Sequence, residues 1–576
     1  MRNFITCLSV CVLSSAAFAD TWTVDDDGKA DFNNIQAAVD AASDGDEIMV
    51  MPGKYIENIS LVNKSIRVYS SYGPDMTIID GNNNGTSFAI TGRIGDVINI
   101  DGLSIINGSG TSTNVTGGQD RVGGGLYIVG GIVTIQNCKI YNNAVIHITP
   151  TQGFYRALGG GIFAEDCILS VIETDCSNNI CDVFNNQHDY TKTAAFGGGI
   201  CSWNGDLTIS SSQITANVAS SDLNGAWTEC YATGGGLCLI NSTSTITKSE
   251  ISHNSAVSKA FPGSGGSGST AGGGGFSALS NSTATIQFSL ISNNTIDIQN
   301  NQTWYEWGRT RANGGGLCVG TEAAFLLVGI PLEGIPTVLL SSCEVLGNSI
   351  IVNTTKGSDV WGAGLASIEG SNVSLIENTN FFENQVIGDG GSYDFGYGGG
   401  VYLSGFSTYV TGVQVMGNYS PTSGGGLYIE PDNETFFVDV TVCGNNIDQL
   451  TGSYEDMGGN IVSNICETDE DEDWIPDDID NCYLYNPDQA DCNGNDVGDV
   501  CDIADGTSSD WDENGIPDDC ECLADIALED GQVNVNDLLS LIAVWDTASS
   551  TGDINNDGNV DIADLLLLIG AWGACP

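Results

Sequence analysis

The chain of 576 residues repeats one short pattern: three small residues, mostly glycines, precede an apolar run, and an asparagine closes the unit. In most frames the two ends lie 17 to 19 residues apart, and apolar residues between them alternate as in β-strands rather than helices. Such a unit can bury its apolar face only against its neighbours, which predicts stacked β coils. The apolar anchors are Leu126, Ile162, Ile200, Leu237, Phe276, Leu317, Leu365, Val401 and Leu427, and the closing residues are Asn143, Asn179, Asn217, Asn254, Asn294, Asn348, Asn384, Asn418 and Asn445.

Both repeated features have a structural interpretation. Glycine permits the positive φ of a tight corner. A buried asparagine can bond the backbone of adjacent coils. We therefore expect the glycines and the asparagines to build the solenoid and not to take part in catalysis.

The segment after residue 19 carries a resemblance to a known family. Residues 25–61, DDDGKADFNNIQAAVDAASDGDEIMVMPGKYIENISL, are followed by IIDG at Ile78–Gly81. This stretch resembles the start of right-handed β-helix proteins of the pectate lyase and pectin esterase type, and the repeats are similar to those of polymorphic outer membrane proteins. For residues 20–465 the resemblance implies an all-β, right-handed parallel β-helix. Phe32, Ile35, Ala38 and Val39 share one face of a short helix, which we expect to cap the open end.

The first 19 residues, MRNFITCLSVCVLSSAAFA, have the pattern of a secretory signal. No later stretch predicts a membrane span, so we expect a secreted or cell-surface protein. Cys7 and Cys11 leave with the signal, and the other 17 of the 19 cysteines then meet an oxidising compartment. Because 17 is odd, at least one thiol stays free or pairs between chains.

Charge narrows the possible partners. The chain has 73 acidic residues, 15 basic residues and a formal net charge of −58 at pH 7. This balance argues against nucleic acid and anionic membranes as partners and favours cations, calcium first.

Residues 466–522 contain no lysine or arginine and alternate carboxylates along the chain. Asn481-Cys482, Asn486–Gln489 and Gly498–Asp502 make this region resemble thrombospondin type 3 repeats. Alternate carboxylates present oxygens on one side of a turn, as a calcium ion with six to eight oxygen ligands requires; a solvated acidic linker is the alternative. The resemblance also implies that Cys482, Cys501 and Cys520 are oxidised. The expected ligands are Asp469, Asp471, Asp473, Asp477, Asp480, Asp491, Asn493, Asn495, Asp499, Asp502, Asp510, Asp512, Asn514 and Asp518.

Residues 523–576 read as two related halves. The second half has the spacing of an EF-hand-like calcium loop followed by an apolar helix. The first half keeps Asp530, Gly531, Asn534 and Asp537 but has Ile526 where the first ligand belongs. The pair resembles dockerin modules, which implies a cohesin-like partner, although Ile562 and Ala563 replace the usual hydroxyl pair and a purely structural module stays open. The ligands of the second loop are Asp553, Asn555, Asp557, Asn559, Asp561 and Asp564.

The connectors from each asparagine to the next anchor predict a binding surface. The last connector has 9 residues and the earlier ones have 17 to 23, so seven of them have residues to spare. We expect these to project as a shelf of adjacent loops. Aromatic faces suit sugar rings and arginine forks suit carboxylate or sulfate groups; packing of the loops on the coil wall is the alternative. The candidate residues are Phe154, Tyr155, Arg156, Trp227, Trp304, Tyr305, Trp307, Arg309, Arg311 and Trp361.

Two functional classes compete. A lyase needs a basic residue to abstract a proton, and a hydrolase needs two carboxylates about 5 to 10 Å apart; neither set can be identified in the sequence. The pectin esterase similarity stops after Gly53–Glu57, and His147, His188 and His253 are scattered. We therefore favour a secreted or cell-surface, calcium-binding β-helix that binds an extracellular, anionic polysaccharide or mediates adhesion. A polysaccharide-degrading enzyme of the pectate lyase-like type is the alternative.

Overall fold

A computed structural model describes residues 19–574 except for several short segments. The chain divides into two compact units, residues 1–464 and 465–576. The segments outside the description are 115–118, 187–188, 225–227, 261–267, 301–309, 321–333, 355–357, 369, 389–394, 465, 467–470, 472, 474, 476–479, 488, 511–514, 518–519, 521, 528–531, 548–551 and 556.

A short helix, α1 (Ile35–Ala41), follows the first strand of the first unit and caps this unit. The side chain of Asn34 accepts a hydrogen bond from the Ala37 N–H at 2.8 Å and so caps the helix. Ile35, Ala38 and Val39 are buried against the first strands of the solenoid, β1 (Thr21–Val24), β2 (Glu47–Val50) and β4 (Ile59–Val62). The predicted cap is therefore confirmed, but the placement of Phe32 on the helix is wrong, because Phe32 precedes the helix and forms a β-bridge with Val24.

Each later coil is built from short strands in a fixed order. One coil comprises β12 (Leu126–Val129), β13 (Ile132–Gln136), β14 (Lys139–Tyr141), β15 (Ala144–Thr149) and β16 (Phe154–Leu158), after which β17 (Ile162–Glu165) begins the next. Strands pair in parallel with the same strand of the next coil, as in Leu126↔Ile162. All nine predicted anchors are the first residues of strands, the others being β22 (Ile200–Trp203), β27 (Leu237–Ile240), β32 (Phe276–Leu279), β37 (Leu317–Val319), β42 (Leu365–Ser367), β47 (Val401–Leu403) and β50 (Leu427–Ile429).

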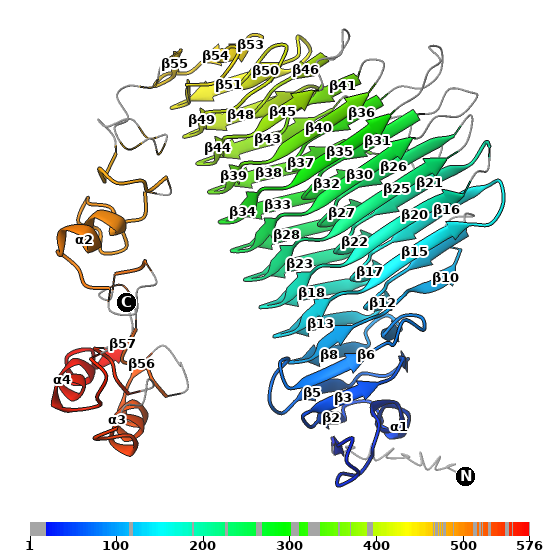
Figure 1. Ribbon diagram of the computed structural model, residues 1–576, viewed down its shortest axis with the longest axis vertical. Helices are drawn as coiled ribbons and strands as arrows, with labels where there is room; N and C mark the ends of the chain where they lie inside the picture. The colour runs from blue at the N-terminus through cyan, green and yellow to red at the C-terminus, as the bar shows by residue number, and fades with distance from the viewer. Residues whose placement is uncertain are drawn as a thin grey trace, which may run out of the picture. The chain divides into compact units, whose positions relative to one another are not determined.

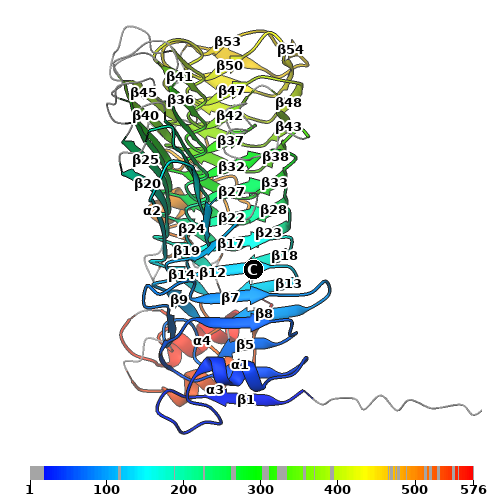
Figure 2. The same ribbon diagram turned by 90° about the vertical axis from the view of Figure 1, so that its right-hand side faces the viewer.

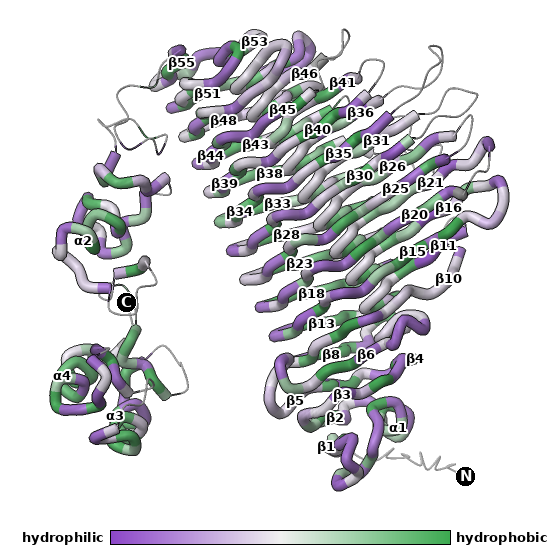
Figure 3. Tube along the Cα trace, viewed as in Figure 1, coloured by the Kyte–Doolittle hydropathy of each residue, from purple (hydrophilic) through white to green (hydrophobic). Residues whose placement is uncertain are grey.

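Three long parallel sheets enclose the main core. Sheet A runs from β1 to β54 (Glu455–Asp456), sheet B from β3 (Gly53–Ile56) to β55 (Ile461–Ser463), and sheet C from β4 to β53 (Leu450–Thr451). Figure 1 shows the coils stacked one on another, and Figure 2 shows the strands of sheet C lying above one another. Inward residues such as Leu126, Ile162 and Ile200 are fully buried, and apolar stretches recur along the stack in Figure 3. The expected all-β parallel β-helix is confirmed.

Two further sheets form an arm that the sequence did not predict. Sheet E contains the strands that follow the asparagines, and sheet D contains the strands that return to the glycines. The expectation that these connectors project wholly as loops is wrong, because alternate residues such as Ala256, Ile296 and Ile350 of sheet E pack on Ala232, Ala271 and Ala312 of sheet D. Besides β15, sheet E contains β20 (Ile180–Asn186), β25 (Val218–Asn224), β30 (Ser255–Ala260), β35 (Thr295–Asn300), β40 (Ser349–Thr354) and β45 (Gln385–Gly388). Besides β16, sheet D contains β10 (Thr111–Thr113), β11 (Gln119–Val122), β21 (Lys192–Phe196), β26 (Glu229–Thr233), β31 (Gly268–Gly272), β36 (Thr310–Asn313), β41 (Ser358–Trp361) and β46 (Phe395–Tyr397).

The asparagines and the glycines meet where the arm joins the three-sided coil. Asn254 donates through Nδ2 to the Asn294 side-chain oxygen at 3.0 Å and to the Ile214 carbonyl at 2.7 Å. A Cβ on Gly236 would lie 2.8 Å from this Nδ2 atom, and one on Gly235 would lie 2.3 Å from the Gly274 carbonyl of the next coil. Gly234 has a φ of +61°. The predicted structural roles of both motifs are confirmed. Gly234 is required by its positive φ, and Gly235 and Gly236 by the close approach of neighbouring atoms.

The second unit is small and partly helical. It contains α2 (Asp499–Asp505), α3 (Val535–Ala543) and α4 (Ile562–Gly570), and β56 (Gln532–Val533) pairs antiparallel with β57 (Gly573–Ala574). Its apolar core is Ala524, Val533, Leu541, Ile554, Val560 and Leu568. Across the described parts of both units, no helix has the length and apolar character needed to cross a membrane.

Candidate functional site

Three carboxylates of the first acidic repeat converge in the second unit. Oxygen atoms of Asp471, Asp473 and Asp480 lie within 4.8 Å of one another. Asp473 is fully buried, and Asp471 and Asp480 border a hollow of about 560 Å³. Three carboxylates this close repel one another unless a cation offsets their charge, and an all-oxygen group suits a hard cation such as calcium.

The next repeat folds around Asp491 and Asp502. Asp491 accepts backbone N–H groups of Gly494 at 2.8 Å, Asn495 at 3.1 Å and Asp496 at 2.9 Å. Asp502 is buried, and its Oδ2 accepts the side-chain amides of Asn493 and Asn495 at 2.8 Å. Its Oδ1 is buried and has no hydrogen-bond partner among the described residues. A bound cation would satisfy this oxygen, so these residues fit the expected calcium site.

The loop before α4 closes as an EF-hand-like loop should. Asp553 accepts the N–H groups of Asp557 at 3.0 Å and Gly558 at 2.8 Å. Asp564, at the twelfth position, is buried and accepts the Ile554 N–H at 2.8 Å. It also accepts the N–H of Asp561, which caps α4. Both ends of the loop are thereby fixed around the predicted ligands, among them Asn555 and Asn559.

The loop before α3 is closed in the same way but lacks the first ligand. Asp537 accepts the N–H groups of Ala527 at 2.8 Å and Asn534 at 2.7 Å, as Asp564 does in the second copy. Ile526 occupies the position of the first ligand, and Asp530 and Gly531 lie outside the described residues. This copy therefore retains the hydrogen bonds accepted by the last loop residue, Asp537, but has no acceptor side chain or oxygen ligand at the first position.

Disulfides hold the acidic repeats together. Cys482 pairs with Cys501 and Cys492 with Cys520, which confirms the expected oxidation of Cys482, Cys501 and Cys520. Asp499 lies beside the second pair, but sulfurs bonded to each other are not thiolate ligands, so this group is not a thiolate metal site. Asp510 accepts the Gly515 N–H at 3.0 Å. The other predicted ligands of this region, Asp469, Asp477, Asp512, Asn514 and Asp518, lie outside the described residues.

The cysteines described as free all lie in the first unit and are buried. Burial raises the pKa of Cys138 and Cys230 to about 12. These thiols therefore stay protonated at physiological pH, which makes them poor nucleophiles.

The predicted sugar-binding residues fall into three groups. Trp227, Trp304, Tyr305, Trp307 and Arg309 lie outside the described residues. Tyr155 and Arg156 are fully buried. Phe154, Arg311 and Trp361 are partly exposed, and the Arg311 Nε lies 4.0 Å from an Asp359 oxygen.

Arg156 illustrates the packing alternative. Its Nε and Nη2 atoms each donate to an Asp120 oxygen at 2.7 Å. Its guanidinium lies over the rings of Phe154, at 5.1 Å, and Trp203, at 5.2 Å. A buried, paired arginine between two rings holds sheet D against sheet C and is not available to a ligand.

An aromatic row between sheets C and D was missed in the sequence. The Trp361 ring lies 5.8 Å from Tyr402, and the Tyr402 ring stacks on Tyr428 at 5.6 Å. The Tyr402 hydroxyl donates to Glu430 at 2.8 Å. The signal was present as an aromatic residue directly after the anchor in GGGVY and GGGLY.

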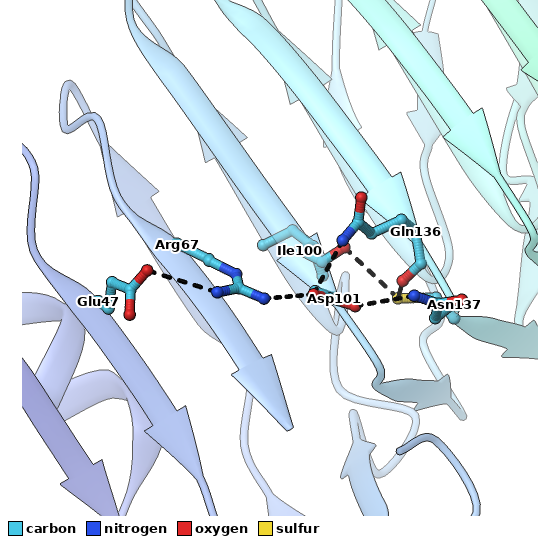
Figure 4. Close-up of polar contacts among 7 residues, drawn as sticks. Glu47, Arg67, Ile100, Asp101, Gln136 and Asn137 are labelled. Carbon is cyan, nitrogen blue, oxygen red and sulfur yellow. Dashed lines mark hydrogen bonds and ion pairs between the residues drawn. The ribbon is translucent and has the colours of Figure 1, made fainter. Parts of the chain in front are cut away.

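A polar ladder crosses the outer face of sheet A in the first coils (Figure 4). Arg67 of β5 (Arg67–Ser70) donates to Asp101 of β8 (Val97–Asp101) at 2.6 Å and to Glu47 at 3.4 Å, and Gln136 donates to Asp101 at 2.9 Å. Burial alone would raise the pKa of Asp101, but the hydrogen bonds from Arg67 and Gln136 outweigh burial and lower it. Asp101 is thus held as a paired carboxylate, which suits a structural role better than that of an acid catalyst.

Comparisons with known proteins add no argument about fold or activity. No protein-family model and no curated protein matches the chain. Solved structures that align with it include a pectin methylesterase from carrot, at 9% identity over 78% of this chain and 88% of that one. An alginate lyase in complex with G6 aligns at 12% identity over 76% and 88%, and a Yersinia enterocolitica family 28 exopolygalacturonase at 10% over 77% and 80%. Each has a TM-score of 0.19, so these likenesses carry no argument about substrate or mechanism.

Proposed function

We propose that the protein is secreted or held at the cell surface, binds calcium through its second unit, and binds an extracellular, anionic polysaccharide at the tips of its arm or mediates adhesion there. The observation that supports binding at the tips is the pairing of sheet E. Val218↔Ser255, Ser255↔Thr295 and Thr295↔Ser349 are direct partners, so successive outgoing strands lie about 4.8 Å apart. The ends of these strands, where the connections to sheet D (the tip segments) begin, therefore lie in a row.

The charge of the arm limits how such a ligand is held. Arg156 is neutralised by Asp120, and Lys192 lies 3.1 Å from Glu229. Attraction of an anionic polysaccharide thus depends on Arg309, on Lys259 of β30, on Arg311, whose Nε lies 4.0 Å from an Asp359 oxygen, and on the aromatic residues of the tip segments. The protein itself has a net charge of −58 and therefore repels an anionic polysaccharide. Bound calcium would lower this repulsion.

We expect the combined change of Trp304, Trp307, Arg309 and Arg311 to Ala to weaken retention of polygalacturonate or alginate at least tenfold, a loss of about 1.4 kcal/mol or more. Affinity electrophoresis measures retention, and the melting temperature should stay close to that of the wild type. Tyr409→Ala removes an exposed ring (53%) on β48 (Ser407–Thr411) of sheet A and is the matched control. Unchanged retention in the fourfold variant, or a collapsed fold, would favour the packing alternative.

The exposed helix faces of the second unit support a docking role. Val535, Leu539 and Ile542 of α3 are 52% to 61% exposed, and Ile562, Leu566 and Ile569 of α4 are 53% to 65% exposed. Each set has the i, i+4, i+7 spacing of one helix face. Soluble domains rarely leave two such apolar stripes uncovered. We propose that a cohesin-like partner covers them.

We expect the double variant Leu539→Asp/Leu566→Asp to bind cohesin domains at least tenfold more weakly than the wild type, because a buried, unpaired carboxylate in the complex is costly. Isothermal titration against a panel of cohesin domains measures this loss. Asn536→Ala, a change of an exposed polar residue on α3, is the control. Equal binding by the double variant would contradict the docking face, and no binding by the wild type would contradict a cohesin-like partner.

A further inference from the structure

The outer face of sheet E brings together charged residues that are far apart in the sequence. Asp182 of β20 pairs directly with Ser220 of β25, and Asp222, two residues further along β25, pairs with Lys259 of β30. Parallel strands lie about 4.8 Å apart and rise about 3.3 Å per residue, so residues offset by two positions on adjacent strands are roughly 8 Å apart. Asp182 and Asp222 therefore have about the separation of the two carboxyl groups in an inverting glycosidase, roughly 6.5 to 9.5 Å.

Both carboxyl groups are incompletely satisfied. The Oδ1 atoms of Asp182 and Asp222 are buried and have no hydrogen-bond partner among the described residues. Yet both side chains lie on an outer face and are partly exposed. A carboxylate oxygen that is removed from water without gaining a hydrogen-bond donor destabilises the folded state. Proteins tolerate such a loss of stability at functional sites.

Apolar neighbours account for this desolvation. Ile146 of β15 is the direct partner of Asp182, and Ile180 and Phe184 flank Asp182 on the same strand face. These three side chains remain 36% to 43% exposed. They offer the C–H face of a sugar ring an apolar surface beside the carboxyl groups.

The two carboxyl groups differ in their charged neighbours. Burial, and next the charge of Asp222, together raise the pKa of Asp182 to about 6, although Ser220 and Lys259 oppose the shift. Burial also raises the pKa of Asp222, but there Lys259 is the next largest influence and lowers it, while Asp297 raises it. Asp182 therefore favours the protonated form, and Lys259 helps to keep Asp222 ionised.

We propose that Asp182 and Asp222 hydrolyse a glycosidic bond of a polysaccharide that lies across the outer face of sheet E, with Asp182 as the general acid and Asp222 as the general base. Lys259 is a positioning residue that keeps Asp222 charged. This inference rests on the proposed binding of polysaccharide and places the degrading activity on the arm, outside the three-sided coil.

The reaction balances with water as the only co-reactant. The Asp182 carboxyl proton moves to the glycosidic oxygen as the bond from this oxygen to the anomeric carbon breaks. Asp222 takes a proton from a water molecule whose oxygen forms the new bond to that carbon from the opposite side. Return of the Asp222 proton to solvent and reprotonation of Asp182 restore both groups.

The test measures reducing ends released from laminarin, xylan, alginate and polygalacturonate by the full-length protein. Asp182→Asn and Asp222→Asn should each lose roughly 100-fold or more of the wild-type rate, the scale of general acid–base catalysis. The wild-type rate should fall as pH rises above about 6, because Asp182 must be protonated. Asp206→Asn, on the outer face of β23 (Asp206–Ser210) in sheet A, should keep the wild-type rate.

Each outcome decides the inference. Binding without release of reducing ends, or wild-type rates in both Asn variants, would overturn it and leave the proposed binding intact. Proton NMR shows the configuration of the anomeric carbon in the first product. Retention of the substrate's configuration would overturn the roles assigned to Asp182 and Asp222, which require inversion. Binding to neither alginate nor polygalacturonate would contradict the proposed binding of an anionic polysaccharide, and binding to none of the four would contradict this activity with it.

A stability measurement tests the environment of Asp182 without substrate. The folded pKa of about 6 exceeds the ordinary value of 3.8, so the folded state holds the proton more tightly than the unfolded state. Stability attributable to this group is complete below pH 3.8 and is lost as pH rises through 6. Asp182→Asn should therefore raise the melting temperature relative to the wild type at pH 8 but not at pH 3.5. An equal effect at both pH values would show that Asp182 is not a perturbed acid.

Discussion

Chelation of calcium by EDTA should expand residues 466–576 while the β-helix keeps its structure. Asp471, Asp473 and Asp480 lie within 4.8 Å of one another, and no lysine or arginine follows Lys356 to offset their charge. Without the ions these carboxylates repel one another, and the small apolar core of this unit offers little to oppose them. Small-angle scattering should report the expansion, and limited proteolysis should cut this unit and spare the coils.

A pair of variants in one loop separates a ligand effect from a general charge effect. Asp502→Asn replaces the buried carboxylate whose Oδ1 lacks a hydrogen-bond partner, and should leave the unit sensitive to protease even at millimolar calcium. Asp496→Asn removes the same charge from an exposed residue with a positive φ, which asparagine tolerates. If EDTA changes neither scattering nor proteolysis, or if both variants behave alike, calcium does not order this unit.

The solenoid could be predicted from the sequence because its signal is repeated. Each anchor begins a strand of sheet C, and each asparagine lies where the chain leaves sheet B for sheet E, or in the last coils where sheet B ends. The strand assignment would be ambiguous from one copy of the repeat alone. The same spacing in successive copies determines which residues stack on one another. The closed acidic loop Asp553–Asp564 could be predicted for a related reason, since its spacing lies within one short segment; its binding of calcium stays a prediction.

The arm and its chemistry depend on pairs that the sequence does not bring together. Arg156 is buried because Asp120, one coil earlier, lies opposite it in sheet D. Asp182 and Asp222 are 40 residues apart and meet only through the register of β20 and β25. The alternation that makes these connectors strands was visible in segments such as SAVSKA (255–260), but each is too short to distinguish from a loop without its neighbours.

Asn254→Ala should destabilise the β-helix more than any exposed polar substitution. The Asn254 side-chain oxygen accepts both the backbone N–H of Asn217 at 2.9 Å and its Nδ2 at 3.0 Å, and its Nδ2 donates to Asn294 and Ile214. All of these side chains are fully buried. Alanine would leave donors and acceptors of two neighbouring coils without partners, each at a cost of about 1 to 3 kcal/mol.

We therefore expect a loss of roughly 3 to 5 kcal/mol in the free energy of unfolding, measured by denaturant titration of the far-ultraviolet circular dichroism. Asn353→Ala, at an exposed position of β40, is the matched control and should change it by less than about 0.5 kcal/mol. Because the asparagines form one continuous ladder from Asn143 to Asn445, the defect should spread to the coils on both sides of the mutation. Hydrogen exchange should then show faster opening of β24 (Gln213–Thr215), β29 (Glu250–Ser252) and β34 (Leu290–Ser292) than of β9 (Ser104–Ile106). A loss no larger than that of Asn353→Ala would mean that water or relaxed neighbours replace the missing bonds, and that the ladder sets the register of the coils without stabilising them.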